Sequence, residues 1–325
     1  MTRHLVREAS PGEIRTGLFE DGKLVEFRID RTRQRLKAGE YHRARVLSRL
    51  PDGKAIVLVD CECEALLEQA PAIAEGTKLE VRVVRPPLPE PGRMKRAIVR
   101  PVKDEPSTPS TADDLPVIND PREIDAANFD ELIEAAVVGE FAIDGGMLTI
   151  ERTRAMTMID IDGGGDPLQL NLVAAQEIPR LLRLLDIGGQ VGIDFLSLPD
   201  RKSRLAVDAA LADACGVLGQ HERTAVNGFG FAQIVRPRTR LSIPEILCGI
   251  TPGRLSTESR ALGLLRLASR SVGHGRRLLM ATHSVIDIIK GWPEELAELQ
   301  KLLGVDIELV PDSSATGYGY VHASQ

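Results

Sequence analysis

Hydrophobic and polar residues alternate along the first hundred positions of the chain, which is the pattern of short, half-buried β-strands. Residues 15–29 predict two strands joined at Asp21-Gly22, a dipeptide that favours a tight hairpin turn. Further strands with Gly- and Pro-containing turns between them predict a small β-barrel over residues 37–102. These strands are expected at residues 41–50, 54–60, 78–85 and 95–101.

The second half of the chain alternates between the periodicities of helices and strands. A hairpin over residues 146–161, an amphipathic helix and a strand at 189–195 predict a strand–helix–strand unit, in which two parallel strands are joined by a right-handed crossover. Residues 201–218 predict another amphipathic helix, and a strand is expected at 231–235. The remaining expected elements are helices at 256–271, 284–291 and 293–303 and strands at 277–281, 305–310 and 318–322.

Composition divides the chain into segments. Residues 103–127 are rich in Pro, Ser, Thr and Asp and poor in apolar residues, which is typical of a linker. We therefore predict an α/β fold in which a small barrel precedes an α/β core and a small C-terminal α/β lobe. The predicted segments are an N-terminal β segment packing on the core (1–36), the barrel (37–102), the linker (103–127), the core (128–250) and the lobe (251–325).

Charge and cysteine content narrow the function classes. The net charge of the chain is −6, but residues 1–50 hold twelve Lys/Arg and seven Asp/Glu and are net +5, which suits either a solvated surface or a nucleic-acid contact. The cysteines form no C-x-x-C pair, so free thiols in a reducing compartment are expected. No segment has the length or apolarity of a membrane span or a signal core, and we expect a soluble cytoplasmic protein without a membrane partner.

The candidate chemistry lies in the strand–helix–strand unit. Each of its two parallel strands ends near a carboxylate, Asp160 in the first and Asp194 in the second. The carboxyl ends of parallel strands meet at one sheet edge, where open α/β sheets bind ligands. Two carboxylates there offer hard oxygen ligands to Mg²⁺ or Mn²⁺. An aspartate at a strand end more often belongs to a solvated turn, so the spacing alone leaves both interpretations open.

This unit resembles the catalytic core of the ribonuclease E/G family, which has a strand ending in "AIDIN", a helix "NLxAAxEIxRxLRLxxxGG" and a strand "VIDF". The corresponding stretches here are TMIDID at residues 157–162, NLVAAQEIPRLLRLLDIGG at 171–189 and GIDF at 192–195. FGFAQIVRPR at residues 229–238 is similar to the family's "FGLxExxRxR". EYHRARV at residues 40–46 resembles, more loosely, a strand "IYxGRV" of the family's OB-type RNA-binding barrel.

The resemblance implies a DNase-I-like catalytic domain joined to an OB-like barrel. It further implies an endoribonuclease that hydrolyses single-stranded RNA to 3′-hydroxyl and 5′-phosphate ends, in RNA processing or decay. In this family Asp160 and Asp194 would hold one Mg²⁺, which activates water and neutralises charge on the phosphate. Asp162, the third expected catalytic residue, stands where the family has Asn, and an ionised Asp accepts but does not donate hydrogen bonds.

Arginines in and beside these motifs are the expected RNA contacts, because guanidinium groups bind phosphate oxygens in pairs. A solvated surface is the competing interpretation for such arginines. Arg236 and Arg238 belong to the third motif, whose strand is expected near the active centre. The other expected contacts are Arg204, in the helix after the second carboxylate, and Arg43 and Arg45 in the barrel.

The chain also departs from the family. The interval between barrel and catalytic hairpin is short, so the 5′-sensor and the RNase-H-like lobe are expected to be missing or vestigial. Only Cys248 stands near the place of the zinc-sharing "C-P-x-C" motif, so a homodimer would not be bridged by zinc. Residues 63–67 stand where a barrel Phe would stack on a base. Two other functions stay open: an RNA-binding protein of this fold without activity, and a metal phosphoesterase for small substrates.

Overall fold

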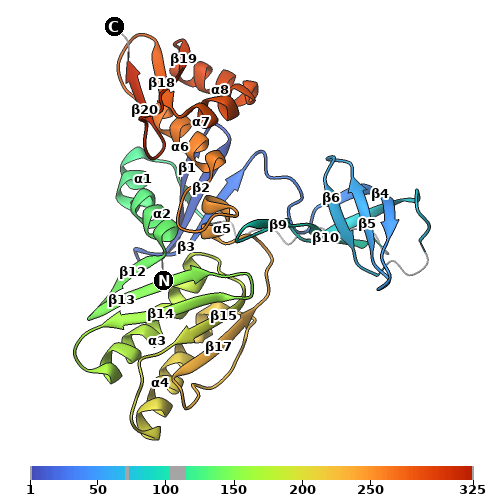
Figure 1. The fold of residues 1–325 in the computed structure, drawn as a ribbon. Helices are drawn as coiled ribbons and strands as arrows, with labels where there is room; N and C mark the ends of the chain where they lie inside the picture. The colour runs from blue at the N-terminus through green and yellow to red at the C-terminus, as the bar shows by residue number, and fades with distance from the viewer. Residues whose placement is uncertain (1, 70–72, 103–114, 324–325) are drawn as a thin grey trace.

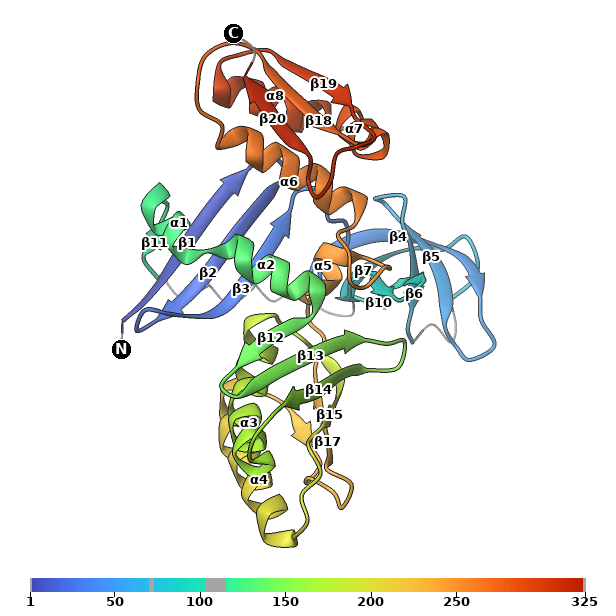
Figure 2. The same cartoon turned by 60° about the vertical axis from the view of Figure 1, so that its left-hand side comes forward.

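The computed structural model describes residues 2–69, 73–102 and 115–323. Figures 1 and 2 show a barrel standing to one side, a larger sheet with helices on one face, and the C-terminal lobe at the far end from that sheet. Separate clusters of buried apolar side chains fill the barrel and the lobe, and a larger one fills the central region. Among the described residues, no helix is long and apolar enough to cross a membrane.

The chain begins with a sheet of strand order β11-β1-β2-β3. Asp21 and Gly22 both have positive φ in the turn between β2 and β3, which confirms the predicted hairpin. Phe27 of this sheet packs against Phe129, and both lie in the central apolar cluster. The strands are β1 (Arg3–Ser10), β2 (Glu13–Glu20), β3 (Lys23–Arg31) and β11 (Val117–Ile118).

The next strands close into a five-stranded barrel of order β10-β6-β5-β4-β7, as the alternating pattern predicts. Its interior consists of aliphatic side chains, because Ala, Val and Leu occupy the inward positions. A short hairpin, β8–β9, follows β7 and lies between the barrel and the rest of the molecule (Figure 1). The bounds are β4 (Tyr41–Arg49), β5 (Ala55–Val59), β6 (Glu64–Leu67), β7 (Lys78–Arg85), β8 (Leu88–Glu90), β9 (Arg93–Lys95) and β10 (Ala97–Pro101).

Part of the expected linker is ordered secondary structure, which corrects that expectation. Val117 and Ile118 of β11 pair in parallel with β1, and α1 (Pro121–Ala127) follows. The helix begins there because Asp120 accepts a hydrogen bond from the backbone N–H of Arg122 and Pro121 occupies the first turn. The polar composition of residues 103–127 predicted a linker and did not reveal this helix cap. Residues 103–114 of the same expected linker lie outside the described residues.

The six-stranded sheet has the order β12-β13-β14-β15-β17-β16. Its strands β14 and β15 are parallel and are connected by the helix α3, as predicted. Helices α3 and α4 cover one face of this sheet (Figure 2). The strands are β12 (Glu140–Ile143), β13 (Gly146–Arg152), β14 (Thr157–Gly163), β15 (Gly189–Asp194), β16 (Glu222–Arg223) and β17 (Phe231–Arg236). The helices of this region are α2 (Phe129–Val138), α3 (Pro167–Leu184), α4 (Arg201–Ala214) and α5 (Ile243–Cys248).

The C-terminal lobe contains a three-stranded sheet of order β19-β18-β20 with helices around it, which confirms the expected elements. α5, just before it, was not expected, although Ser242 and Glu245 form the reciprocal capping box that starts this helix. The elements of the lobe are α6 (Thr257–Ser269), β18 (Arg277–Ala281), α7 (His283–Lys290), α8 (Pro293–Leu303), β19 (Ile307–Pro311) and β20 (Tyr320–Ala323).

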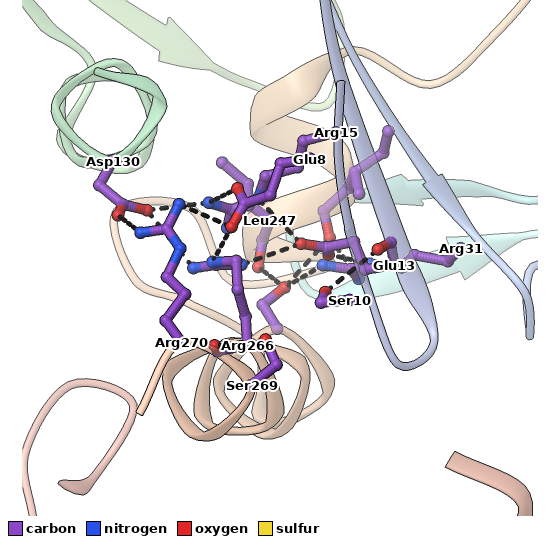
Figure 3. Close-up of polar contacts among 12 residues, drawn as sticks. Glu8, Ser10, Glu13, Arg15, Arg31, Asp130, Leu247, Arg266, Ser269 and Arg270 are labelled. Atoms are coloured by element: carbon purple, nitrogen blue, oxygen red, sulfur yellow. Dashed lines mark hydrogen bonds and ion pairs between the residues drawn. The ribbon is translucent and has the colours of Figure 1, made fainter. Parts of the chain in front are cut away.

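A buried network of charged side chains joins the lobe to the N-terminal sheet (Figure 3). Glu13 accepts hydrogen bonds from Arg15 (3.0 Å), Arg31 (3.1 Å) and Arg266 of α6 (3.1 Å). Arg15 also donates to Asp130 of α2 at 2.8 Å. Burial acts to raise the pKa of Glu13, but the three guanidinium groups outweigh it and hold this pKa below its usual value. The network therefore fixes α2 and α6 against the same sheet.

Candidate active site on the open face of the sheet

Asp160 and Asp194 lie side by side on neighbouring parallel strands. They are direct partners in the β14–β15 register, so their Cα atoms are separated by about 4.8 Å, the ordinary distance between paired strands. Ile159 and Ile193, the residues before them, are fully buried beneath the helices. Because side chains alternate across a strand, both aspartates project from the opposite, open face, where they are exposed. The structure thus brings the two carboxylates together, while their catalytic role stays a prediction.

Asp162 projects from the same open face, two residues beyond Asp160 on β14. Within the part of the chain that the structure describes, none of these three carboxylates has a hydrogen-bond or ion-pair partner. Like charges on one face repel one another, although water weakens that repulsion at an exposed site. Carboxylate oxygens are the ligands that Mg²⁺ takes, so Asp160 and Asp194 are candidate ligands for such an ion.

The site suits Mg²⁺ better than a structural zinc ion. No group of three or more His, Cys, Asp or Glu side chains close enough to hold a metal occurs among residues 2–69, 73–102 and 115–323. A structural zinc takes four protein ligands, whereas Mg²⁺ keeps several waters and takes one or two carboxylates. Asp160 and Asp194 supply such a pair.

Asn171 of α3 fixes the segment that follows Asp194, a role that the sequence analysis did not assign. Its side chain is fully buried, donates to the carbonyl of Leu196 at 2.8 Å and accepts from the N–H of Leu196 at 3.0 Å. The backbone N–H and C=O of Leu196 are thereby both held by the Asn171 side chain. Asn171 opens the helix motif quoted above, which was the available signal.

Gly192 leaves room for neighbouring side chains to cover β15 on the open face. A Cβ at this position would lie 2.8 Å from the Phe231 ring, 2.9 Å from the Met158 sulfur and 3.0 Å from the Met156 sulfur. Gly192 lies two residues before Asp194 on the same face. An apolar surface therefore adjoins the carboxylates.

Arg204 lies at the first turn of α4, close along the chain to the second carboxylate. Its Nη1 donates to the carbonyl of Leu198 at 3.1 Å, and Asp200 caps the helix by accepting from the N–H of Ser203. The guanidinium is half-buried and forms no ion pair with a carboxylate within the described residues. It retains donors that could meet an anion beside the site.

Arg236 and Arg238 are not near the aspartates, which corrects the expectation for the third motif. β17 runs antiparallel to β15, so Phe231 is opposite Asp194 and Arg236 is opposite Gly189, about 17 Å further along the strand. Arg236 donates to the carbonyls of Leu182 and Ile187, and burial lowers the pKa of its guanidinium. Arg238 is paired with Glu245 at 2.7 Å. Both arginines thus have structural contacts at the other end of the sheet.

Arg43 and Arg45 are exposed on β4 of the barrel. Together with Lys78 they border a surface hollow of about 800 Å³. The barrel stands to one side of the rest of the molecule (Figure 1). Asp60, Glu62 and Glu80 line the same hollow, so these two arginines belong to a surface of mixed charge on the barrel.

The described cysteines are free thiols, as expected. Cys215 and Cys248 are buried in the central cluster. Burial, together with a hydrogen bond involving Cys63, raises the pKa of the Cys61 thiol to about 11, so this thiol is protonated at neutral pH.

Comparison with known proteins agrees with the sequence resemblance. The sequence profile of the Ribonuclease E/G family matches residues 105–239. The chain is 32% identical over 188 residues to Ribonuclease G of Escherichia coli (strain K12), which covers 51% of this chain and 38% of that protein. It is 35% identical over 130 residues to Ribonuclease G of Haemophilus influenzae and 33% identical over 152 residues to Ribonuclease E of Escherichia coli (strain K12), covering 26% and 14% of those proteins.

The chain thus spans well under half the length of these curated relatives. The matched region contains the whole β14–α3–β15 unit with Asp160, Asp162 and Asp194. The sequence resemblance is thereby confirmed: residues 105–239 of this chain are similar to the Ribonuclease E/G family.

Proposed function

We propose that this protein is a Mg²⁺-dependent endoribonuclease that hydrolyses single-stranded RNA and leaves 3′-hydroxyl and 5′-phosphate ends. The observation that carries the proposal is the pair Asp160 and Asp194, adjacent on one open sheet face and without a partner in the described chain. The matched relatives named Ribonuclease G and Ribonuclease E support RNA as the substrate.

In this proposal Asp160 and Asp194 hold the metal from one side, since Mg²⁺ takes one or two carboxylates. Mn²⁺ would suit the same oxygen ligands. Bound there, the ion would lower the pKa of a water and neutralise charge that develops on the phosphate. Asn171 keeps the segment after Asp194 in place, and Arg204, which follows that segment at the first turn of α4, would donate to a phosphate oxygen.

The six-stranded domain would then be of the DNase-I-like type, and the five-stranded barrel would be an OB-like module that grips RNA. Arg43 and Arg45, exposed beside the hollow on β4, would contact the backbone of the RNA. Activity in the cytoplasm, in RNA processing or decay, follows from the same proposal. A homodimer, if formed, would be held by apolar surface rather than by zinc.

The test is cleavage of a labelled single-stranded RNA by the purified protein, with Mg²⁺ or with EDTA. Asp160→Asn and Asp194→Asn should each lower the rate by about 10³-fold or more, because a metal carboxylate contributes several kcal/mol in the transition state. Glu140→Gln is the matched control. Glu140 is exposed on β12, two strands and about 10 Å from Asp160, and should leave the rate within about twofold.

Each outcome distinguishes a named alternative. Cleavage in EDTA, or an unchanged rate in either aspartate variant at saturating Mg²⁺, contradicts the proposed site. RNA binding without cleavage under all conditions indicates the non-catalytic RNA-binding protein. Hydrolysis of small phosphate esters without cleavage of RNA indicates the small-substrate phosphoesterase.

A further inference from the structure

Phe229 is exposed to an extent that sets it apart from the other phenylalanines. The chain contains seven, and those at positions 19, 27, 129, 141, 195 and 231 are buried or half-buried. The Phe229 side chain is 89% exposed. Single apolar residues on a surface are ordinary, so exposure alone decides nothing. What matters is how this residue is held and what lies beside it.

The loop that carries Phe229 is tied by its own hydrogen bonds. The side-chain oxygen of Asn227 accepts from the backbone N–H groups of Phe229 (2.8 Å) and Phe231 (3.1 Å). The Asn227 N–H donates to the Phe231 carbonyl at 3.0 Å, and the Gly230 N–H donates to the Asn227 carbonyl at 3.2 Å. The ring is therefore presented to solvent from an ordered turn, which lowers the entropy lost when a ligand binds to it.

This turn abuts the end of β15. The Phe195 N–H donates to the Gly230 carbonyl at 3.1 Å, so the residue after Asp194 is bonded to the residue after Phe229. A Cβ at Gly230 would lie 2.7 Å from the Phe195 carbonyl oxygen, and only glycine permits this approach. Phe231, two residues further on, is the direct strand partner of Asp194. The turn that carries the exposed ring thus adjoins the end of β15, next to Asp194.

Phe231 shows what a ring with a structural role looks like at the same place. The tip of its ring lies over Gly192, 2.8 Å from where a Cβ would stand, and the ring is half-buried on the open face of the sheet. Phe229 has no such covering role. The two phenylalanines are two residues apart in the chain, yet only Phe231 packs against the sheet.

We propose that Phe229 is a stacking platform for an unpaired RNA base. That base would lie next to the phosphate whose hydrolysis Asp160 and Asp194 would promote. The inference rests on the proposed function and adds the residue that receives a base. Exposed aromatic rings bind single-stranded nucleic acid by stacking, with little dependence on sequence because every base has a π-face. A base in a duplex is already stacked on both sides, so the platform selects unpaired RNA.

Tryptophan fluorescence tests the stacking without relying on cleavage. The chain has a single tryptophan, Trp292, which is 9% exposed in the lobe, so Phe229→Trp adds one solvent-exposed reporter. The measurement uses this substitution in the Asp160→Asn background with Mg²⁺ and a fluorescein-labelled single-stranded oligoribonucleotide. Label anisotropy reports binding, and the emission of the new tryptophan reports stacking. We expect quenching at saturation, and recovery when one nucleotide of the RNA is made abasic.

A second experiment separates binding from chemistry in the active protein. Phe229→Ala should raise KM, and the Kd for RNA, by between about 5-fold and 150-fold, while kcat changes much less. Phe229→Trp should restore both constants. Val272→Ala is the matched control, because Val272 is 90% exposed in the lobe and its truncation should change neither. The urea midpoint should be the same in all variants, since Phe229 contributes little buried surface.

Three results would overturn the inference, and they are distinguishable from failure of the proposed function. RNA that binds by anisotropy without changing the tryptophan emission would show that no base meets residue 229. Wild-type KM in Phe229→Ala would show the same in the active protein, with the endoribonuclease activity intact. Absence of RNA binding by both signals would reject the stacking platform and RNA as the substrate together.

Discussion

Two groups of carboxylates in this molecule differ in their burial and in their partners. Glu13, in the network of Figure 3, is 2% exposed and accepts hydrogen bonds from three arginines. Asp160, Asp162 and Asp194 are exposed on an open sheet face and have no partner within the described residues. Where a charge is buried for architecture, the chain compensates it with guanidinium groups. Where charges are left uncompensated side by side, the compensation is expected from a ligand.

The energetic reason for the difference is solvent. Removing one member of a buried ion pair leaves an uncompensated charge in a poorly polarisable interior, which costs about 3–5 kcal/mol. Two like charges about 4 Å apart in water repel by only about 1 kcal/mol. The fold can therefore tolerate the three aspartates but could not tolerate an unpaired Glu13. The following predictions test this contrast, beginning with the largest effect.

Glu13→Gln should lower the free energy of unfolding by about 3–5 kcal/mol, because Arg15, Arg31 and Arg266 would lose their shared carboxylate. Urea denaturation measures the change. Cleavage per folded molecule should stay at the wild-type rate, because Glu13 belongs to the N-terminal sheet and not to the open face. Glu140→Gln, at an exposed carboxylate, serves as the control for charge removal alone. A loss below about 1 kcal/mol would mean that the network contributes little.

The network should also contribute to stability in acid. Burial acts to raise the pKa of Glu13 and of Asp130, yet the arginines around them outweigh it and both values lie below their usual values of 4.5 and 3.8. A carboxyl group with a lowered folded-state pKa stabilises the protein above its unfolded pKa and loses that contribution as pH falls through the folded value. The free energy of unfolding should therefore decline as the pH drops below about 4.5.

Urea midpoints measured from pH 7 to pH 3 give this profile. The Glu13→Gln variant should show a flatter decline, since it has already lost the titrating group. An equally steep profile in Glu13→Gln would assign acid sensitivity to other groups.

Mg²⁺ should act on the other group of carboxylates. An ion that binds only the native state stabilises it by RT ln(1 + [Mg²⁺]/Kd), which is about 2.7 kcal/mol at a hundredfold excess over Kd, and therefore raises the unfolding temperature. The wild type and Glu13→Gln should both show a rise with Mg²⁺, measured by calorimetry. Asp160→Asn and Asp194→Asn should not. A rise that persists in both aspartate variants would place the ion elsewhere.

Sequence reasoning located the candidate site because the site is local in sequence. Asp160 and Asp194 end two strands joined by one helix, and the crossover rule then fixes them as neighbours. Arg236 and Arg238 were misplaced because their position depends on the direction of β17, which a motif does not encode. The antiparallel pairing carries both arginines to the far end of the sheet.

Features that depend on distant pairing were not predictable. Glu13 meets Arg266 across 253 residues, and no local pattern indicates that contact. The strand β11 is only two residues long, and it is a strand because it pairs with β1. The exposure of Phe229 was likewise hidden, since its turn lies between two short strands whose register sets what the ring contacts. Fold class and the carboxylate pair follow from sequence, whereas the surroundings of the pair need the structure.

Asp162→Asn should give the smallest effect of the set, and it asks whether the third unpaired carboxylate belongs with the first two. Asp162 lies two residues beyond Asp160 on the same face and is opposite Met147 at the end of β14. Removing its charge relieves repulsion, so stability should rise by no more than a few tenths of a kcal/mol, of the order measured for exposed charge pairs. Loss of a negative charge near the ion should raise the Mg²⁺ concentration for half-maximal cleavage, while the rate at saturating Mg²⁺ changes by less than about tenfold, or 1.4 kcal/mol. A collapse of the saturated rate to the level of Asp194→Asn would make Asp162 a member of the catalytic set, because extra Mg²⁺ could not then replace what its carboxylate does.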